Sequence, residues 1–321
     1  MPKRSKPVQQ ESPFCLQIEL VEGCNLRCSF CGLNGIRGKE NEFKQMSLRH
    51  AEDIADQIAE LGWNPRLEFA MHGEPSAHRK LDTVLRKFRS RLPNHHMMMT
   101  SNGYGFLSDI TLVDQVLESV NVLALDSYDG IKIVPRILKR YEGKHDVRYY
   151  PKDKTANPHK RRKPSERLLV VIKDIDSATS GNHATLNNHA GAGAPKNDRL
   201  QGKRCAKPFR EMSIRWDGNV AICCNDWRGV YKCGYAVDEG IEEIWNGPEF
   251  VAARKKLYNG QRDFGPCDGC DAASYRTGLL PDKMGKQELS GPSESDLVII
   301  EEACAGRSYT EPVLRDWESK T

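Results

Sequence analysis

Strand-like and helix-like segments alternate along the first 125 residues, and this alternation limits the fold more than any other feature. Apolar and polar residues alternate at Cys15–Leu20, which predicts a strand, and Ser47–Leu61 has helical periodicity with Ser47 suited to the N-cap. Further strands are expected at 67–71, 96–100 and 120–125, with helices at 80–91 and 107–119. Because strand–helix repeats of this length favour a parallel sheet, we expect an α/β fold arranged as a partial or complete (β/α) barrel.

The alternation weakens beyond Tyr128. Residues 132–173 form an insert rich in Lys and Arg, interrupted by two strand-like runs at 147–150 and 168–172. Prolines between these runs argue against a helix there, which predicts a shortened or open barrel. Two interpretations of the basic residues stay open: an anion-binding surface for nucleic acid, nucleotide or phosphate, or a solvated charged face beside a flexible loop.

Eleven cysteines among 321 residues require an explanation. The basic N-terminal residues are followed by no apolar run of signal-peptide length, and no stretch approaches the roughly 20 apolar residues of a membrane span. We therefore expect a cytoplasmic protein without membrane contact, in which reduced, closely spaced cysteines bind metal or perform redox chemistry. The net charge of +4 does not by itself argue for nucleic-acid binding.

Three of these cysteines, Cys24, Cys28 and Cys31, lie in one short segment after the first predicted strand. Three thiolates at this spacing can each bind one iron of a [4Fe–4S] cluster, which leaves the fourth iron without a protein ligand. An open coordination position allows a metal centre to bind a small molecule. The alternative is a zinc site, for which His72 is the nearest fourth ligand in sequence order.

The spacing C-x-x-x-C-x-x-C, with Phe30 before the last cysteine, resembles the signature of the radical S-adenosylmethionine superfamily. The resemblance implies that S-adenosylmethionine binds the unique iron and is cleaved to a 5′-deoxyadenosyl radical, which abstracts hydrogen from a substrate. It also implies a reductant of the flavodoxin or ferredoxin type. No residue is singled out as the catalytic acid or base.

Polar motifs at 71–75, 100–103 and 126–127 end three of the predicted strands. Each motif alone is ordinary turn chemistry. Together they lie where (β/α) barrels keep their active sites, and they resemble the superfamily's contacts with the amino group, ribose and carboxylate of the cofactor. The cofactor-binding residues that the resemblance implies are Phe30, Gly73, Glu74, Pro75, Ser101, Asn102, Asp126 and Ser127.

A second cysteine-rich segment, 205–270, resembles the auxiliary-cluster extension of such enzymes, the SPASM or twitch domain. A full SPASM domain would carry two more cysteines, at positions where this chain has Arg276 and Leu280. The resemblance thus implies one auxiliary [4Fe–4S] cluster in an electron-transfer role. Its ligands would be Cys205, Cys223, Cys267 and Cys270, with Cys224 and Cys233 as replacements and a four-cysteine zinc site as the alternative.

These features divide the chain into a disordered arm (1–13), a radical SAM core with its basic insert (14–200), a small cysteine-rich α+β auxiliary domain (201–283) and a tail of unknown role (284–321). We expect a radical SAM oxidoreductase or isomerase that oxidises or rearranges a polar small molecule, a nucleotide or a modified base. Other hypotheses are modification of an amino-acid-decorated thymine in phage-type DNA, peptide maturation, and a non-catalytic zinc or nucleic-acid-binding module. If one face of the first strand lines the barrel, Gln17 and Glu19 contact the substrate; the alternative is a polar layer at the base of the barrel.

Overall fold

The computed structural model describes residues 12–28, 30–35, 43–128, 132–172, 188–193, 198–272 and 290–305. Nearly all of the expected N-terminal arm, and the tail apart from 290–305, lie outside the described residues. Within these ranges no helix combines the length and the apolar character needed to cross a membrane.

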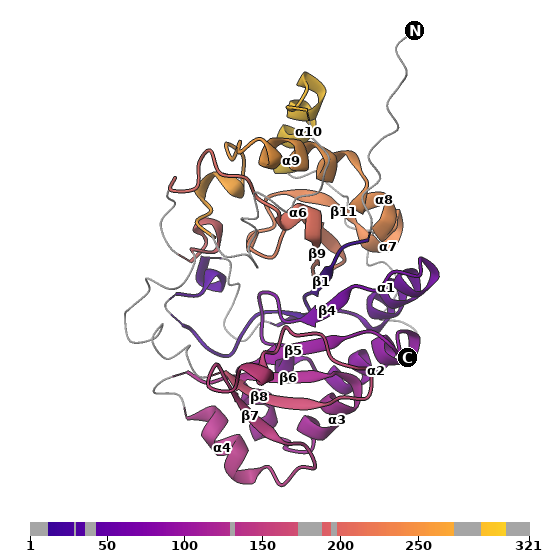
Figure 1. Ribbon diagram of the computed structural model, residues 1–321, viewed down its shortest axis with the longest axis vertical. Coiled ribbons are helices and arrows are strands. Elements are labelled where there is room, and N and C mark those ends of the chain that lie inside the picture. Colours follow the sequence, from indigo (N-terminus) through magenta and orange to yellow (C-terminus); the bar gives the residue numbers. More distant parts are fainter. Residues whose placement is uncertain are drawn as a thin grey trace, which may run out of the picture.

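A nine-stranded sheet organises the molecule (Figure 1). Its strand order is β11-β10-β9-β1-β4-β5-β6-β8-β7, and the pairings from β9 to β7 are all parallel. Because β11 and β7 are the two ends of this order, the described sheet is an incomplete barrel. The strands are β1 (Cys15–Ile18), β4 (Arg66–Phe69), β5 (Met97–Ser101), β6 (Val122–Asp126), β7 (Val147–Tyr150), β8 (Leu168–Ile172), β9 (Glu211–Ile214), β10 (Asn219–Ala221) and β11 (Lys232–Tyr235).

Helices of the first half cover one face of this sheet (Figure 1). They are α1 (Leu48–Glu60), α2 (Leu81–Arg91), α3 (Leu112–Ser119) and α4 (Ile133–Arg140). The Ser47 side chain accepts a hydrogen bond from the His50 backbone N–H at 3.0 Å, so the predicted N-cap of α1 is confirmed. Leu16 and Ile18 of β1 are fully buried in the core beneath these helices, which leaves Gln17 on the opposite face.

Helix α4 is the element of the first half that the sequence interpretation missed. It lies within the basic insert, and it buries Ile133, Val134 and Ile137. Pro135 lies in its first turn, where proline removes no intrahelical hydrogen bond. No α-helix occurs between β7 and β8 in the described chain, as the prolines predicted, and one 3-10 turn, η4 (Lys154–Ala156), lies there.

The second half continues the same sheet. Strand β9 pairs in parallel with β1, with Glu211 opposite Cys15, and β10 and β11 extend it as an antiparallel hairpin. The helices here are α6 (Lys207–Arg210), α7 (Ala236–Glu239), α8 (Ile241–Trp245), α9 (Pro248–Tyr258) and α10 (Glu294–Ala305). The remaining short elements are β2 (Val21–Glu22), β3 (Lys44–Gln45), η1 (Gly32–Gly35), η2 (Pro75–Ala77), η3 (Tyr104–Leu107), η6 (His189–Gly191) and η7 (Cys267–Gly269).

Candidate active site

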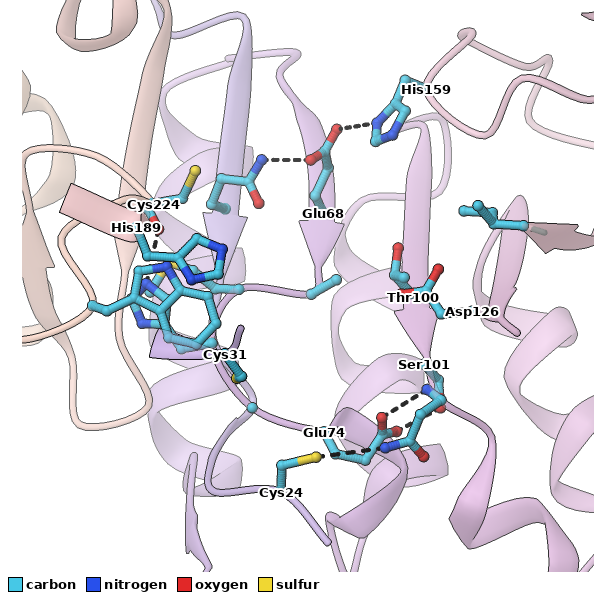
Figure 2. Close-up of a pocket in the computed structure, with 18 of the residues that line it drawn as sticks. Cys24, Cys31, Glu68, Glu74, Thr100, Ser101, Asp126, His159, His189 and Cys224 are labelled. Atoms are coloured by element: carbon cyan, nitrogen blue, oxygen red, sulfur yellow. Dashed lines mark hydrogen bonds and ion pairs between the residues drawn. The ribbon is translucent and has the colours of Figure 1, made fainter. Parts of the chain in front are cut away.

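A cavity of about 850 Å³ opens on the face of the sheet opposite the α1–α4 layer. Cys24, Cys28 and Cys31 all line it. In Figure 2, Cys24 and Glu74 lie at one end of the cavity, while Glu68 lies toward the other. The parallel strands therefore bring the first cysteine loop and a set of polar side chains to one cavity.

The loop that follows β2 carries the three cysteines in a half-buried position. The Cys31 backbone N–H donates to the Cys28 carbonyl at 3.0 Å, and Cys24 Sγ accepts hydrogen bonds from Leu26 N–H at 3.3 Å and from Asn102 Nδ2 at 3.5 Å. Hydrogen bonds to sulfur are a usual feature of iron–sulfur ligands. Beside Cys24, the Asn25 side-chain nitrogen is buried without a partner. Three thiols and an unsatisfied donor are a donor set that fits a bound cluster and its small-molecule ligand.

The turn after β4 lies directly against this loop. Gly73 approaches the Val21 carbonyl so closely that a Cβ atom would be only 1.8 Å from the oxygen, so no other residue fits without moving the chain. The Glu74 backbone N–H donates to the Gly23 carbonyl at 2.9 Å. The predicted Gly-Glu-Pro motif therefore positions the cysteine loop through its backbone.

The Glu74 side chain is almost fully buried, and burial raises its pKa. Its carboxylate accepts hydrogen bonds from the Ser101 hydroxyl, from Asn102 N–H at 2.8 Å and from Ser76 N–H at 2.8 Å. Pro75, also buried, begins the 3-10 turn that presents Ser76. Glu74 therefore ties the end of β5 to the turn after β4, and its contact with the cofactor stays a prediction.

Asp126 ends β6 and lines the cavity, as predicted for a strand end. Ser127 follows it, but its side chain is not among the described residues that line the cavity, and its N–H donates to Ile172 at 3.0 Å. Phe30 lines the cavity and stacks on Tyr128, with ring centroids 6.3 Å apart. Burial raises the pKa of Tyr128 well above its usual value, and the charge of Asp126 adds to the effect, so this phenol stays protonated.

A carboxylate at the far end of the cavity is held by three neighbours. Glu68 of β4 accepts from the Gln17 side chain, pairs with Arg66, and lies 3.1 Å from His159 Nδ1 (Figure 2). Gln17 therefore faces the cavity as expected. Glu19 does not line it, because its side chain is buried between His72, at 3.0 Å, and Arg215. Glu68 and His159 were not predicted, although a charged residue within an apolar strand was a signal for Glu68.

The second cysteine group is more deeply buried than the first. Cys205, Cys223 and Cys267 are each less than a tenth exposed, and Cys270 completes the group. Burial raises the pKa of Cys267 well above its usual value, and the charges of the other three cysteines raise it further, which places the four within electrostatic reach. Four thiols can supply one ligand to each iron of a [4Fe–4S] cluster, so this donor set fits a fully ligated cluster.

The two alternative ligands, Cys224 and Cys233, have different surroundings from these four cysteines. Cys233 lies in the core, where burial and then the charges of Glu249 and Asp226 raise its pKa. Cys224 lines the cavity, and its Sγ accepts a hydrogen bond from Lys207 at 3.2 Å. Within the described ranges, no three His, Cys, Asp or Glu side chains are gathered as they would be around a single metal ion.

Trp227 connects the two cysteine groups. Its ring lies between those of His72 and His189, with centroid distances of 4.7 and 4.4 Å. It also packs on Gly32, where a Cβ would be 2.7 Å from the indole. His72 Nε2 is 2.9 Å from the carbonyl oxygen of Cys224, so this layer spans the space between the first loop and the auxiliary segment.

Comparison with protein families matches two segments of this chain. Residues 18–150 match the radical SAM superfamily, and residues 205–271 match SPASM, an iron–sulfur cluster-binding domain. A curated relative, the S-adenosyl-L-methionine-dependent 2-deoxy-scyllo-inosamine dehydrogenase of Niallia circulans, is 23% identical over 263 residues, which cover 82% of this chain and 94% of the relative. GTP 3′,8-cyclase of Haemophilus influenzae is 24% identical over 121 residues, which are 37% of this chain and 35% of the cyclase.

Solved structures share the fold. The crystal structure of BtrN in complex with AdoMet and 2-DOIA superposes with a TM-score of 0.64 at 18% identity, covering 85% of this chain and 98% of BtrN. BtrN in an open conformation gives a TM-score of 0.58 at 16% identity, covering 83% and 96%.

The fold and the two cysteine groups define a class of iron–sulfur radical enzymes. The chain belongs to the radical SAM superfamily and carries a SPASM domain. The predicted family, the α/β fold class and the enzyme class are confirmed, and the two domains imply a [4Fe–4S] cluster, S-adenosylmethionine and auxiliary iron–sulfur chemistry. A non-catalytic zinc or nucleic-acid-binding module does not account for these matches.

Proposed function

We propose that the enzyme binds a polar small molecule, a nucleotide or a modified base in the 850 Å³ cavity and removes a hydrogen atom from it. The observation that carries this proposal is the composition of the cavity wall. One end holds three thiols suited to a cluster with an open iron, and the rest presents polar and charged side chains, among them Glu68, His159 and Lys207. A polar substrate could meet both at once.

In this proposal, Cys24, Cys28 and Cys31 hold the first cluster. When bound, the cluster and S-adenosylmethionine supply a 5′-deoxyadenosyl radical that abstracts hydrogen from the substrate. The cofactor-binding residues are those expected from the strand-end motifs, with Asn102 and Asp126 directed at the cavity. Ser127 contributes through the backbone geometry of the β6 end.

Glu68 is the side chain best placed to orient the substrate. Because Gln17 donates to its carboxylate and Arg66 pairs with it, the carboxylate has a fixed orientation in the wall. Such a group accepts hydrogen bonds from the hydroxyl or amino groups of a polyol, aminocyclitol or sugar. His159, 3.1 Å from Glu68, places a second polar ring at the same wall.

Oxidation is the reaction type we favour, with the four cysteines Cys205, Cys223, Cys267 and Cys270 holding one auxiliary [4Fe–4S] cluster. A fully ligated cluster has no open position for substrate and is suited to carrying an electron. The Niallia circulans relative, similar over most of both chains, is named as a dehydrogenase. A redox-neutral rearrangement, as in an isomerase, is the alternative outcome of the same hydrogen abstraction.

A second candidate substrate is an amino-acid-decorated thymine in phage-type DNA. The observation that favours it is a pair of basic side chains, Lys160 and Arg210, that line the same cavity and suit phosphate groups. A free aminocyclitol would not require them. Peptide maturation has no comparable support among the described residues.

Other parts of the proposal concern the setting of the reaction. We propose a reductant of the flavodoxin or ferredoxin type and a cytoplasmic location, because reduced thiols and iron–sulfur sites suit a reducing compartment. We also propose residues 14–200 as the catalytic core and 201–283 as the auxiliary domain, with β9 joining the two through the shared sheet.

The test is an anaerobic assay of the iron-reconstituted enzyme with S-adenosylmethionine, reductant and carbon-deuterated candidates. These are 2-deoxy-scyllo-inosamine, nucleosides and thymine-modified oligonucleotides. Transfer of deuterium into 5′-deoxyadenosine identifies the substrate class. Absence of 5′-deoxyadenosine from protein with about eight iron atoms per chain would falsify the proposal.

A further inference from the structure

The side chains of the adjacent cysteines Cys223 and Cys224 lie in different surroundings. Among the described residues Cys223 does not line the cavity, and burial raises its pKa, as do the charges of Cys224, Cys270 and Cys205, so Cys223 lies within electrostatic reach of the auxiliary group. Cys224 instead lines the cavity, together with the three cysteines of the first loop (Figure 2). The doublet thus presents one thiol to each site.

A buried ammonium group fixes the position of the Cys224 thiol. Lys207, only 4% exposed, donates to Cys224 Sγ at 3.2 Å and pairs with Glu211 on the neighbouring strand β9. A second anchor is the Cys224 carbonyl oxygen, 2.9 Å from His72 Nε2. Since Glu211 already balances the charge of Lys207, the local charge does not require a thiolate at Cys224.

The surroundings of Cys224 differ from those of the other cysteines assigned no ligand role. Cys15 is fully buried in β1, Cys233 is in the core and Cys304 lies on α10; none of these lines the cavity among the described residues. An S–H bond is weaker than the C–H bonds of a sugar or polyol. A thiol at the wall of a radical cavity can therefore give its hydrogen atom to a carbon radical.

We propose that Cys224 is a hydrogen-atom donor to carbon radicals formed in this cavity. The inference rests on the proposed function, because it needs a radical in the cavity. The S–H bond breaks, a C–H bond forms, and Cys224 becomes a thiyl radical. One electron from the enzyme's one-electron reductant and one proton from solvent restore the thiol, so a substrate radical is quenched without net oxidation of the substrate.

This role gives the enzyme a route to a redox-neutral product. If the substrate radical instead loses an electron and a proton, the product is oxidised and Cys224 is not used. The position of Cys224, beside a cysteine of the auxiliary group and in the wall of the cavity, places both outcomes within one site.

The experiment uses S-adenosylmethionine as the only probe. Reconstituted wild-type enzyme, Cys224→Ala and Cys224→Ser are transferred to D₂O, where the thiol becomes S–D, and are incubated with dithionite without added substrate. Mass spectrometry measures the deuterated fraction of the 5′-deoxyadenosine formed. We expect deuterium with the wild-type enzyme and its loss in both variants, while the iron content stays unchanged.

Two matched controls exclude other donors. Tyr128→Phe removes a phenolic hydrogen from the wall of the cavity, and Cys304→Ala removes a thiol that does not line it. Both should retain the label. Loss of the label in Tyr128→Phe would assign the donor to Tyr128 and overturn the inference.

The remaining outcomes separate a failure of this inference from a failure of the proposed function. Undeuterated 5′-deoxyadenosine from the wild-type enzyme, or label that persists in Cys224→Ala, overturns the donor role and leaves the proposed function standing. Loss of about four iron atoms in Cys224→Ala makes Cys224 a cluster ligand and overturns the inference. If no variant forms 5′-deoxyadenosine, the proposed function and the inference fail together.

Discussion

The two cysteine groups differ in number, burial and surroundings. The first has three half-buried thiols on a loop that lines a large cavity, and the second has four thiols, three of them less than a tenth exposed. A cluster held by three ligands keeps one position for a small molecule, whereas four ligands close it. In the proposed function, the first group therefore carries the chemistry and the second group transfers electrons.

Removing one ligand of the open group should have the largest effect. In Cys28→Ala, two thiols remain at the first site, so we expect no detectable 5′-deoxyadenosine by liquid chromatography and mass spectrometry. The control is Cys304→Ala, which changes a cysteine that does not line the cavity. Cleavage of the cofactor by the Cys28 variant at an appreciable rate would show that this loop is not the reactive site.

Removing one ligand of the closed group should separate cofactor cleavage from substrate oxidation. Cys267→Ala should lower the iron content from about eight to about four atoms per chain. We expect 5′-deoxyadenosine to form still, while the yield of oxidised product falls to background. Full turnover by this variant would refute the electron-transfer role of the second group.

Replacing Trp227, which packs against His72 and His189, tests whether the two cysteine groups act together in turnover. Trp227→Leu loses the stacks on His72 and His189, and we expect a loss of about 2–4 kcal/mol in the free energy of unfolding of the metal-free protein. The ratio of 5′-deoxyadenosine to product should also rise. Trp216→Leu, which changes a tryptophan outside this stack, is the matched control; equal effects in both would argue against a bridging role.

The same layer should give the protein a pH-dependent stability. Burial, and then the nearby His72, lower the pKa of His189 from 6.5 to about 4, and its Nδ1 accepts from Gly32 N–H at 3.1 Å. Below pH 6.5 His189 binds a proton in the unfolded chain but not in the folded protein. Its contribution to the free energy of unfolding therefore falls as the pH drops toward 4, by at most about 1.4 kcal/mol per pH unit.

His189→Phe keeps a ring against Trp227 and removes the titrating group. Urea unfolding of the metal-free protein between pH 7 and pH 4.5 should show a shallower loss of stability in this variant. Identical pH profiles for the two proteins would contradict the assignment.

The smallest effect is expected next to the open group. Ser101→Ala removes one hydrogen bond to the buried Glu74 carboxylate, at a cost of about 1–2 kcal/mol in the free energy of unfolding. The affinity for S-adenosylmethionine, measured by calorimetry, should weaken because Glu74 and Asn102 are less well positioned. Ser90→Ala, on the exposed face of α2, should change neither quantity.

Local patterns were sufficient to predict most strands and helices of the first half of the fold. Strand β4 begins within one residue of its expected position, and α1 differs from its expected bounds by one residue at each end, because the apolar periodicity of each segment matches the face it buries. Helix α4 was missed because its segment was interpreted as part of a Lys- and Arg-rich insert. The pairing of β9 with β1 could not be predicted, because it joins segments far apart in the chain.

The candidate site was predictable where chemistry depends on spacing. The cysteine loop and the strand-end motifs were visible because their residues are close in sequence, and the structure brings most of them to one cavity. Glu68, His159 and Lys207 come from three distant segments, and only the assembled sheet places them together. The sequence also could not show that the Cys223 and Cys224 side chains have different surroundings, because this difference arises only where the folded chain turns after β10.

The parallel pairing of β1 with β9 has a consequence for biosynthesis. Cys15 of β1 lies opposite Glu211 of β9. One edge of β1 therefore stays unpaired during synthesis until β9, far along the chain, has left the ribosome. Until then the growing chain exposes the unpaired edge of this strand near the first cysteine loop. Cutting the gene at the apparent domain border would make that transient state permanent and expose an edge prone to aggregation.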